Sequence, residues 1–125
     1  MKEKSILFVC TGNTCRSPMA EYLAKRRISE KKANITVASA GITAFDGDFP
    51  SSNAVKVMHE IGIDISSHRA AHLTENIIVE ADCIFTMTRR QADIIKSFFP
   101  FAADKIRLLG EQDITDPYGG DAEIY

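Results

Sequence analysis

The chain lacks the features that mark secreted, membrane-spanning and nucleic-acid-binding proteins. Its three cysteines are an odd number at no spacing typical of a disulfide framework, which favours a reducing cytoplasm. No apolar run approaches the roughly 20 residues that cross a bilayer, and residues 1–4 lead into a strand-like segment without the apolar core of a signal peptide. The formal net charge of −2 gives no general attraction to nucleic acid or to an acidic membrane. We therefore expect a cytoplasmic protein with neither kind of partner.

The sequence that is present fits one α/β domain. Its 125 residues, 45% of them hydrophobic, suffice for a single core. Strand-like and helix-like segments alternate. The pattern predicts strands at 5–9, 35–38, 83–87 and 105–109, and helices beginning at 17–18, at 51 or 52, at 74 and after 87, with a turn at 39–41. Such alternation indicates a parallel sheet covered by helices on both faces.

The strongest sign of function is the segment Cys10-Thr11-Gly12-Asn13-Thr14-Cys15-Arg16-Ser17. It joins a predicted strand to a predicted helix, where free N–H groups and the helix dipole favour an anion. The Arg16 guanidinium matches two phosphate oxygens, and a thiol in that field is stabilised as its thiolate. Ligands of parallel sheets bind beyond the carboxyl ends of the strands, where this loop falls. The segment therefore predicts a bound oxyanion above a sulfur nucleophile, unless the cysteine and arginine are paired by chance.

A second candidate is Asp116-Pro117-Tyr118-Gly119-Gly120, in the loop after the last predicted strand. A carboxylic acid held over the cysteine loop can protonate a leaving group and then take a proton from attacking water. The alternative is a tight turn carrying an aromatic side chain. Beside the cysteine loop, the catalytic interpretation is favoured.

Four segments together resemble the low-molecular-weight protein-tyrosine-phosphatase family. They are Val9 to Glu21 (VCTGNTCRSPMAE), Ser39-Ala40-Gly41, Gly62 to Arg69 (GIDISSHR) and Asp116-Pro117-Tyr118. The resemblance implies a four-stranded parallel, flavodoxin-like sheet, a single phosphatase domain over residues 1–125, and no metal or other cofactor. Family members usually continue into a C-terminal helix, whereas this chain stops at Tyr125. We therefore expect either a fragment or a face covered by a partner.

The resemblance also implies roles for single residues. Cys10 would be the nucleophile that forms a cysteinyl-phosphate, Arg16 the clamp on the phosphoryl group, and Asp116 the general acid and then base. The loop residues that would surround the phosphoryl group of a phosphorylated protein, or inorganic phosphate or a similar oxyanion, are Thr11, Gly12, Asn13, Thr14 and Cys15.

Supporting residues follow from the same resemblance. Ser17 would donate a hydrogen bond to the Cys10 thiolate, although it also fits an N-cap ahead of Pro18. Asn13 would adopt a left-handed conformation braced by Ser39 and His68, although His68 can also be read as an ordinary surface histidine.

The substrate class rests on three positions that would line the pocket. Position 14 is usually aliphatic in members that act on tyrosine, whereas a branch that resembles protein-arginine phosphatases carries threonine there, as this chain does. A hydroxyl can meet the N–H groups of a guanidinium. Against this, Phe45 falls where tyrosine-directed members often place an aromatic side chain, and Tyr118 suits either pocket. Phosphoarginine is slightly favoured over phosphotyrosine.

Two rival functions are weaker. An arsenate reductase would need a resolving cysteine where this chain has Thr88, and Cys83 comes five residues too early. An inactive phospho-protein binding module would not need Cys10, Arg16 and Asp116 all intact.

Cys15 adds a possible redox role. A thiol in the same loop as Cys10 can trap an oxidised Cys10 as a disulfide. The alternative is that Cys15 only fills space beneath the loop.

Overall fold

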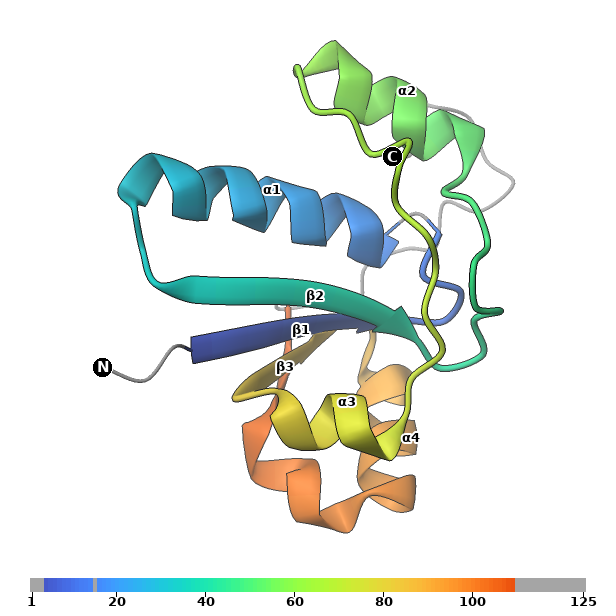
Figure 1. Ribbon diagram of the computed structural model, residues 1–125. Coiled ribbons are helices and arrows are strands. Elements are labelled where there is room, and N and C mark those ends of the chain that lie inside the picture. The colour runs from blue at the N-terminus through green and yellow to red at the C-terminus, as the bar shows by residue number, and fades with distance from the viewer. Residues whose placement is uncertain (1–3, 15, 110–125) are drawn as a thin grey trace.

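A central strand, β1 (Lys4–Cys10), organises the molecule. In the computed structural model, which describes residues 4–14 and 16–109, β1 pairs in parallel with β2 (Ile35–Gly41) on one side and β3 (Cys83–Thr86) on the other. A short β4 (Ile106–Leu108) pairs in parallel with β3 and completes the order β2-β1-β3-β4 (Figure 1). The predicted four-stranded parallel sheet is confirmed, and its strand order is the flavodoxin-like one.

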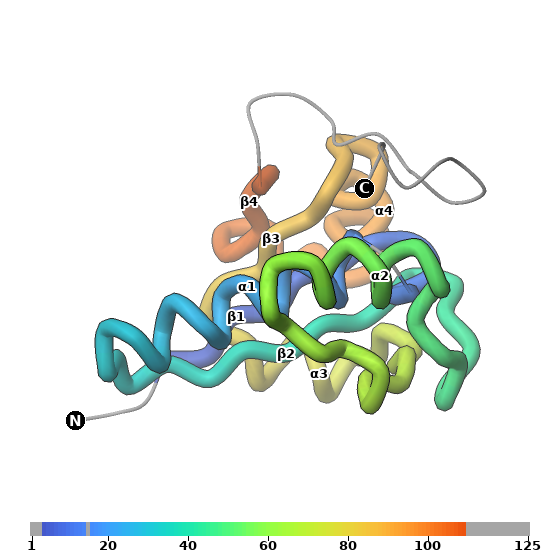
Figure 2. Tube along the Cα trace, turned by 90° about the horizontal axis from the view of Figure 1, so that it is seen from above, coloured from blue at the N-terminus to red at the C-terminus, as the bar shows by residue number. Residues whose placement is uncertain are grey.

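Helices cover both faces of this sheet. Two lie on one side, α1 (Arg16–Lys31) and α2 (Ser52–Glu60), and Figure 2 shows α2 beyond the N-terminal end of α1. The opposite side carries α3 (Glu75–Glu80), α4 (Arg89–Phe98) and the 3-10 helix η1 (Pro100–Lys105). None of the helices within residues 4–14 and 16–109 is long and apolar enough to cross a membrane.

The helix starts follow from local sequence. The side chains of Ser51, Thr74 and Thr88 each accept a hydrogen bond from a backbone N–H in the first turn of the helix that follows. Each bond satisfies a donor that the helix cannot pair internally. After α2, Gly62 takes a φ of +82°, a conformation that ends helices and that glycine adopts without strain.

Two local expectations are wrong and one element was not expected. Residues 39–41 do not form a turn: they extend β2, so that Gly41 pairs with Cys10 in the register. Ser17 is not an N-cap, because α1 already begins at Arg16. The 3-10 helix η1 follows α4, where the sequence analysis predicted no element.

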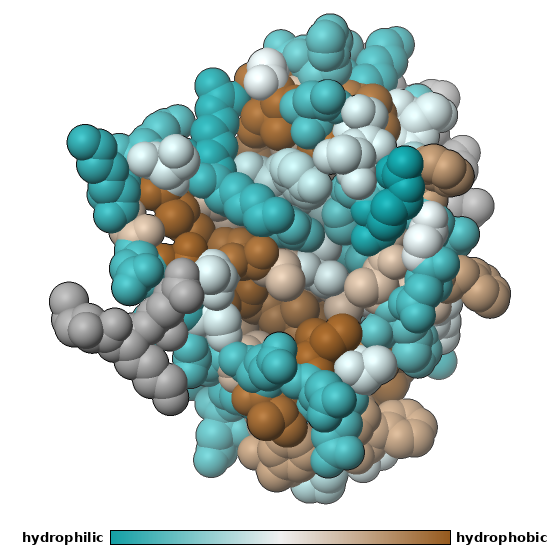
Figure 3. Space-filling model, viewed as in Figure 1, coloured by the Kyte–Doolittle hydropathy of each residue, from teal (hydrophilic) through white to brown (hydrophobic). Residues whose placement is uncertain are grey.

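The sheet is held by apolar packing on both faces. On the α3 and α4 side the core includes Leu7, Ile78, Ile84 and Ile95, each at most 2% exposed. Full burial of one such side chain contributes about 1.5–3 kcal/mol. An open groove of about 320 Å³ lies where β1 and β2 meet α3, and Figure 3 shows apolar side chains between the polar surfaces of the helices.

Candidate active site

The register of β1 and β2 places two loops side by side. Cys10 and Gly41 end their strands opposite each other, so the chain that leaves each strand emerges at the same edge of the sheet. We call residues 10–17 the phosphate-binding loop and residues 42–51 the rim loop. A Cβ on Gly41 would lie 2.7 Å from the Thr11 carbonyl oxygen and 2.9 Å from the Asn13 nitrogen. Only glycine therefore lets the two loops approach this closely.

Cys10 lies at the floor of the phosphate-binding loop and is 1% exposed. Its Sγ accepts a hydrogen bond from the Asn13 backbone N–H at 3.1 Å and is hydrogen-bonded to Ser17 Oγ at 2.8 Å. When the sulfur is a thiolate, the Ser17 hydroxyl is the donor. Two donors aimed at one sulfur stabilise its negative form, as a nucleophile requires.

Asn13 holds the loop in shape. Its φ of +57° is unusual for a residue other than glycine and persists only where the surroundings enforce it. The side-chain amide donates to Ser17 Oγ at 2.7 Å and to Ser39 Oγ at 2.8 Å, and its oxygen accepts from the Ala71 N–H at 2.9 Å. The Asn13 carbonyl oxygen lies 3.2 Å from His68 Nε2. The structure therefore places Ser39 and His68 against Asn13, and His68 is buried rather than on the surface.

A buried carboxylate extends this network, and the sequence analysis gave it no role. Glu21 is 6% exposed and accepts a hydrogen bond from the Ser39 hydroxyl, with Lys25 paired to it one helical turn later. His68 Nδ1 is 3.8 Å from Glu21. Burial lowers the pKa of His68 below its ordinary value of 6.5, against smaller opposing effects of the Glu21 charge and the Asn13 carbonyl. The signal in the sequence was the spacing of Glu21 from Ser17, which puts both on one face of α1.

Gln91 links the opposite face of the sheet to the same loop. Its Oε1 accepts hydrogen bonds from the backbone N–H groups of Met87 and Thr88, both at 3.0 Å, and its Nε2 donates to Thr11 Oγ1 at 3.1 Å. Thr88 and Gln91 also form the capping box of α4. The position that an arsenate reductase would give to a resolving cysteine is thus occupied by a helix cap.

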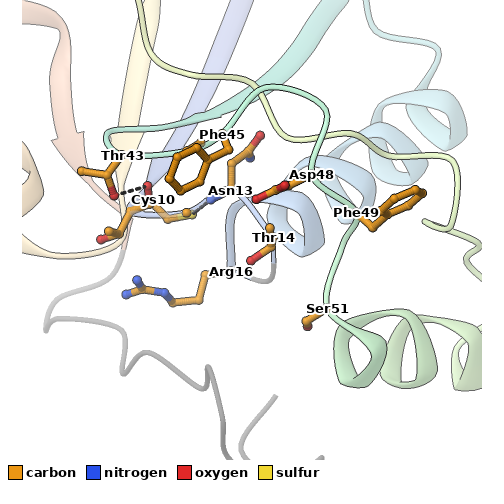
Figure 4. Close-up of a pocket in the computed structure, with 12 residues that line it drawn as sticks. Cys10, Asn13, Thr14, Arg16, Thr43, Phe45, Asp48, Phe49 and Ser51 are labelled. Atoms are coloured by element: carbon orange, nitrogen blue, oxygen red, sulfur yellow. Dashed lines mark hydrogen bonds between the residues drawn. The ribbon is translucent and has the colours of Figure 1, made fainter.

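A pocket of about 530 Å³ opens above Cys10 (Figure 4). From the phosphate-binding loop it is lined by Cys10, Thr11, Gly12, Asn13, Thr14 and Arg16, and from the rim loop by Thr43, Ala44, Phe45, Asp48, Phe49 and Ser51. Six sequence-predicted residues of the loop and Phe45 therefore meet in one space. The rim contributions of Asp48 and Phe49 were not foreseen, because no motif marks them.

Three predicted site residues, Cys15, Asp116 and Tyr118, lie outside the described residues. Ser17 lies beneath the pocket, where it contacts the sulfur. Arg16 is 7% exposed and begins α1 at the pocket wall.

Comparisons with known proteins agree with this geometry. Residues 5–125 match the family described as low molecular weight phosphotyrosine protein phosphatase. The chain is 40% identical over 128 residues to a low molecular weight protein-tyrosine-phosphatase, Ptp, of Acinetobacter johnsonii, covering 100% of this chain and 87% of that protein. It is also 40% identical over 126 residues to a protein-arginine-phosphatase of Bacillus subtilis (strain 168), covering 96% and 83%.

One solved structure shares the fold and has a phosphorylated residue in its active site. A mutant of the YwlE arginine phosphatase with a phosphorylated active-site serine superposes with a TM-score of 0.93 at 38% identity, covering 97% of this chain and 83% of that one. The phosphorylated serine agrees with the transfer of a phosphoryl group to an active-site side chain in that protein.

Proposed function

Because this chain belongs to the low molecular weight phosphotyrosine protein phosphatase family and is a protein phosphatase, we propose that it acts through a cysteinyl-phosphate on Cys10, with phosphoarginine as the preferred substrate. The observation that carries the mechanism is the pair of hydrogen bonds to Cys10 Sγ at the floor of the pocket. The preference rests on Thr14, whose side chain lines that pocket.

In the proposed first step, the phosphoryl oxygens accept hydrogen bonds from the N–H groups of the phosphate-binding loop and from Arg16. Cys10 Sγ attacks phosphorus, the S–P bond forms, and the bond from phosphorus to the leaving nitrogen breaks. Asp116 gives its proton to that nitrogen. Ser17 keeps the sulfur in line and stabilises it when it leaves as a thiolate in the second step.

The second step returns the enzyme to its starting state. Water attacks the phosphorus of the cysteinyl-phosphate, and Asp116 takes one of its protons. The S–P bond breaks, inorganic phosphate is released and Cys10 is again a thiolate. Every atom and proton is accounted for by substrate, water, Cys10 and Asp116.

Phosphotyrosine is the second candidate substrate, and Phe45 favours it. The ring of Phe45 lines the pocket and is 75% exposed, so that it is open to stacking against another ring. Thr14 favours phosphoarginine, because its hydroxyl can accept a guanidinium N–H that an aliphatic side chain would leave unpaired.

Arsenate reduction has less support in the arrangement of thiols. Cys83 pairs with Ile6 in the register of β3 and β1, whereas Cys10 is four residues further along β1. At about 3.3 Å per residue the two positions are separated by about 13 Å along the strands, too far for a disulfide.

The deciding experiment compares kcat/KM for matched peptides that carry phosphoarginine or phosphotyrosine. We expect the phosphoarginine peptide to be the better substrate. A clear preference for the phosphotyrosine peptide would contradict the proposal and leave the phosphatase assignment intact.

A further inference from the structure

The rim loop holds one acidic residue at a defined position beside the pocket. The backbone of Asp48 and of its neighbour Gly47 is hydrogen-bonded to Ala70. The Ala70 N–H donates to the Asp48 carbonyl at 2.8 Å, and the Gly47 N–H donates to the Ala70 carbonyl at 2.9 Å. A little further on, the Ser51 N–H donates to the Thr14 carbonyl at 2.8 Å. The bond from Ser51 couples the rim loop directly to the phosphate-binding loop, and the two bonds with Ala70 hold the segment around Asp48, so the backbone sets the position of Asp48 relative to Thr14.

The carboxylate of Asp48 faces the pocket. Asp48 is one of its lining residues, and Figure 4 shows the carboxylate directed toward Thr14. Among the residues that the structure describes, no hydrogen bond or ion pair of this carboxylate is found. Its neighbour Asp46 differs, because Asp46 Oδ1 accepts a hydrogen bond from the His72 N–H at 2.7 Å and so stabilises the loop itself.

We propose that Asp48 binds the positively charged guanidinium of a phosphoarginine substrate, together with Thr14. This inference rests on the proposed function and adds a specificity-determining residue to it. The phosphoryl group of such a substrate occupies the phosphate-binding loop, where Arg16 and the loop N–H groups compensate its negative charge. The guanidinium is bonded directly to that phosphoryl group, so it lies at the level of the pocket wall formed by Thr14 and Asp48. A carboxylate that accepts guanidinium N–H groups makes a charge-assisted hydrogen bond.

The same carboxylate discriminates against phosphotyrosine. A phenyl ring offers no N–H donor and no positive charge to Asp48, so in phosphotyrosine nothing compensates the repulsion between this carboxylate and the phosphoryl dianion, whereas the guanidinium of phosphoarginine does. Asp48 therefore raises activity on one substrate and lowers or leaves unchanged activity on the other. A purely structural role in the rim loop would affect both substrates in the same direction.

The test is Asp48→Asn, which keeps the size of the side chain and removes its charge. We expect kcat/KM for a phosphoarginine peptide to fall about 3- to 30-fold, between the effects of an exposed ion pair and of a hydrogen bond to a charged group, and mainly through KM. The value for a phosphotyrosine peptide should stay constant or rise. Asp48→Glu should retain most of the phosphoarginine activity.

Asp93→Asn is the matched control. Asp93 is exposed on α4 and does not line the pocket, so this variant removes the same charge at a distant position. It should change neither activity. An unchanged ratio of the two activities in Asp48→Asn, with phosphoarginine hydrolysis intact in the wild type, would overturn this inference alone. A wild type that does not hydrolyse phosphoarginine would overturn the proposed substrate preference and this inference together.

Discussion

The floor of the pocket and its rim are built in opposite ways. Cys10, Asn13 and Ser17 on the floor are at most 1% exposed and are joined by hydrogen bonds of 2.7–3.1 Å. Phe45 and Phe49 on the rim are 75% and 69% exposed. The floor is enclosed by β1, β2 and α1, whereas the rim is a loop that leaves the sheet. The buried, hydrogen-bonded floor thus holds the residues proposed for the chemistry that every phosphoryl substrate shares. The exposed rim holds residues proposed to recognise the rest of the substrate, where a side chain can change with little effect on the fold.

The most severe test of this division is Cys10→Ser on the floor. Turnover should be abolished, because a serine hydroxyl is not ionised at neutral pH, while oxyanion binding largely survives on the loop N–H groups and Arg16. Steady-state assays and phosphate binding by calorimetry measure the two properties separately. Hydrolysis retained by this variant would rule out the cysteinyl-phosphate.

Asp116→Asn tests the proposed general acid, which lies outside the described residues. Loss of a general acid should cost about 10²–10⁴ in rate on substrates with poor leaving groups. The loss should be smaller on an activated aryl phosphate, whose phenolate leaves without a proton. An equal loss on both kinds of substrate would indicate that Asp116 positions the substrate instead.

Thr14 lies at the boundary between the floor and the rim of the pocket. Thr14→Ile should therefore alter the preference between the two substrates more than the rate of the chemical steps. The loss of one hydrogen bond to a charged group corresponds to about 1.5–3 kcal/mol, or about 10–150-fold in kcat/KM for phosphoarginine. Activity on phosphotyrosine should be spared or raised, because isoleucine packs on a ring. If the ratio of the two activities does not change, Thr14 is not the selector and the tyrosine interpretation gains support.

The smallest expected effect is on the pH dependence of the free energy of unfolding, through the buried network around His68. The pKa of His68 is lowered in the folded protein, chiefly by burial, so the unfolded chain binds more protons near pH 6.5 than the folded one does. The stabilisation from neutral His68 is therefore present above pH 6.5 and is lost as the pH falls through the lower, folded-state pKa. We expect the difference in unfolding free energy between the wild type and His68→Gln to shrink from pH 7.5 to pH 5.

Denaturant unfolding across that pH range provides the measurement. His59→Gln is the matched control, since His59 is exposed on α2. A difference between the wild type and His68→Gln that grows toward low pH would reverse the assigned direction of the pKa change.

Residues that act within one short segment could be predicted from the sequence. The strand before Cys10, the helix after it and the loop between them are local patterns, and their order implies the parallel sheet because each crossover helix must return the chain to the same edge. The caps at Ser51 and Thr74 are local for the same reason, since donor and acceptor are three residues apart.

Only the tertiary structure decided which distant groups meet at the site. Residues 39–41 read locally as a turn, yet pairing with the central strand extends β2 to Gly41 and brings the rim loop against the phosphate-binding loop. Gln91 is hydrogen-bonded to Thr11, 80 positions away in the sequence. Asp48 faces Thr14 because the rim loop is hydrogen-bonded to Ala70 and to the phosphate-binding loop. The sequence by itself determined the alternation of strands and helices and pointed to Cys10 and its loop as the proposed nucleophile and anion site, because those depend on neighbours along the chain. The buried support of Asn13 and the acidic side of the pocket depend on neighbours across the sheet, and no pattern of local spacing specifies them.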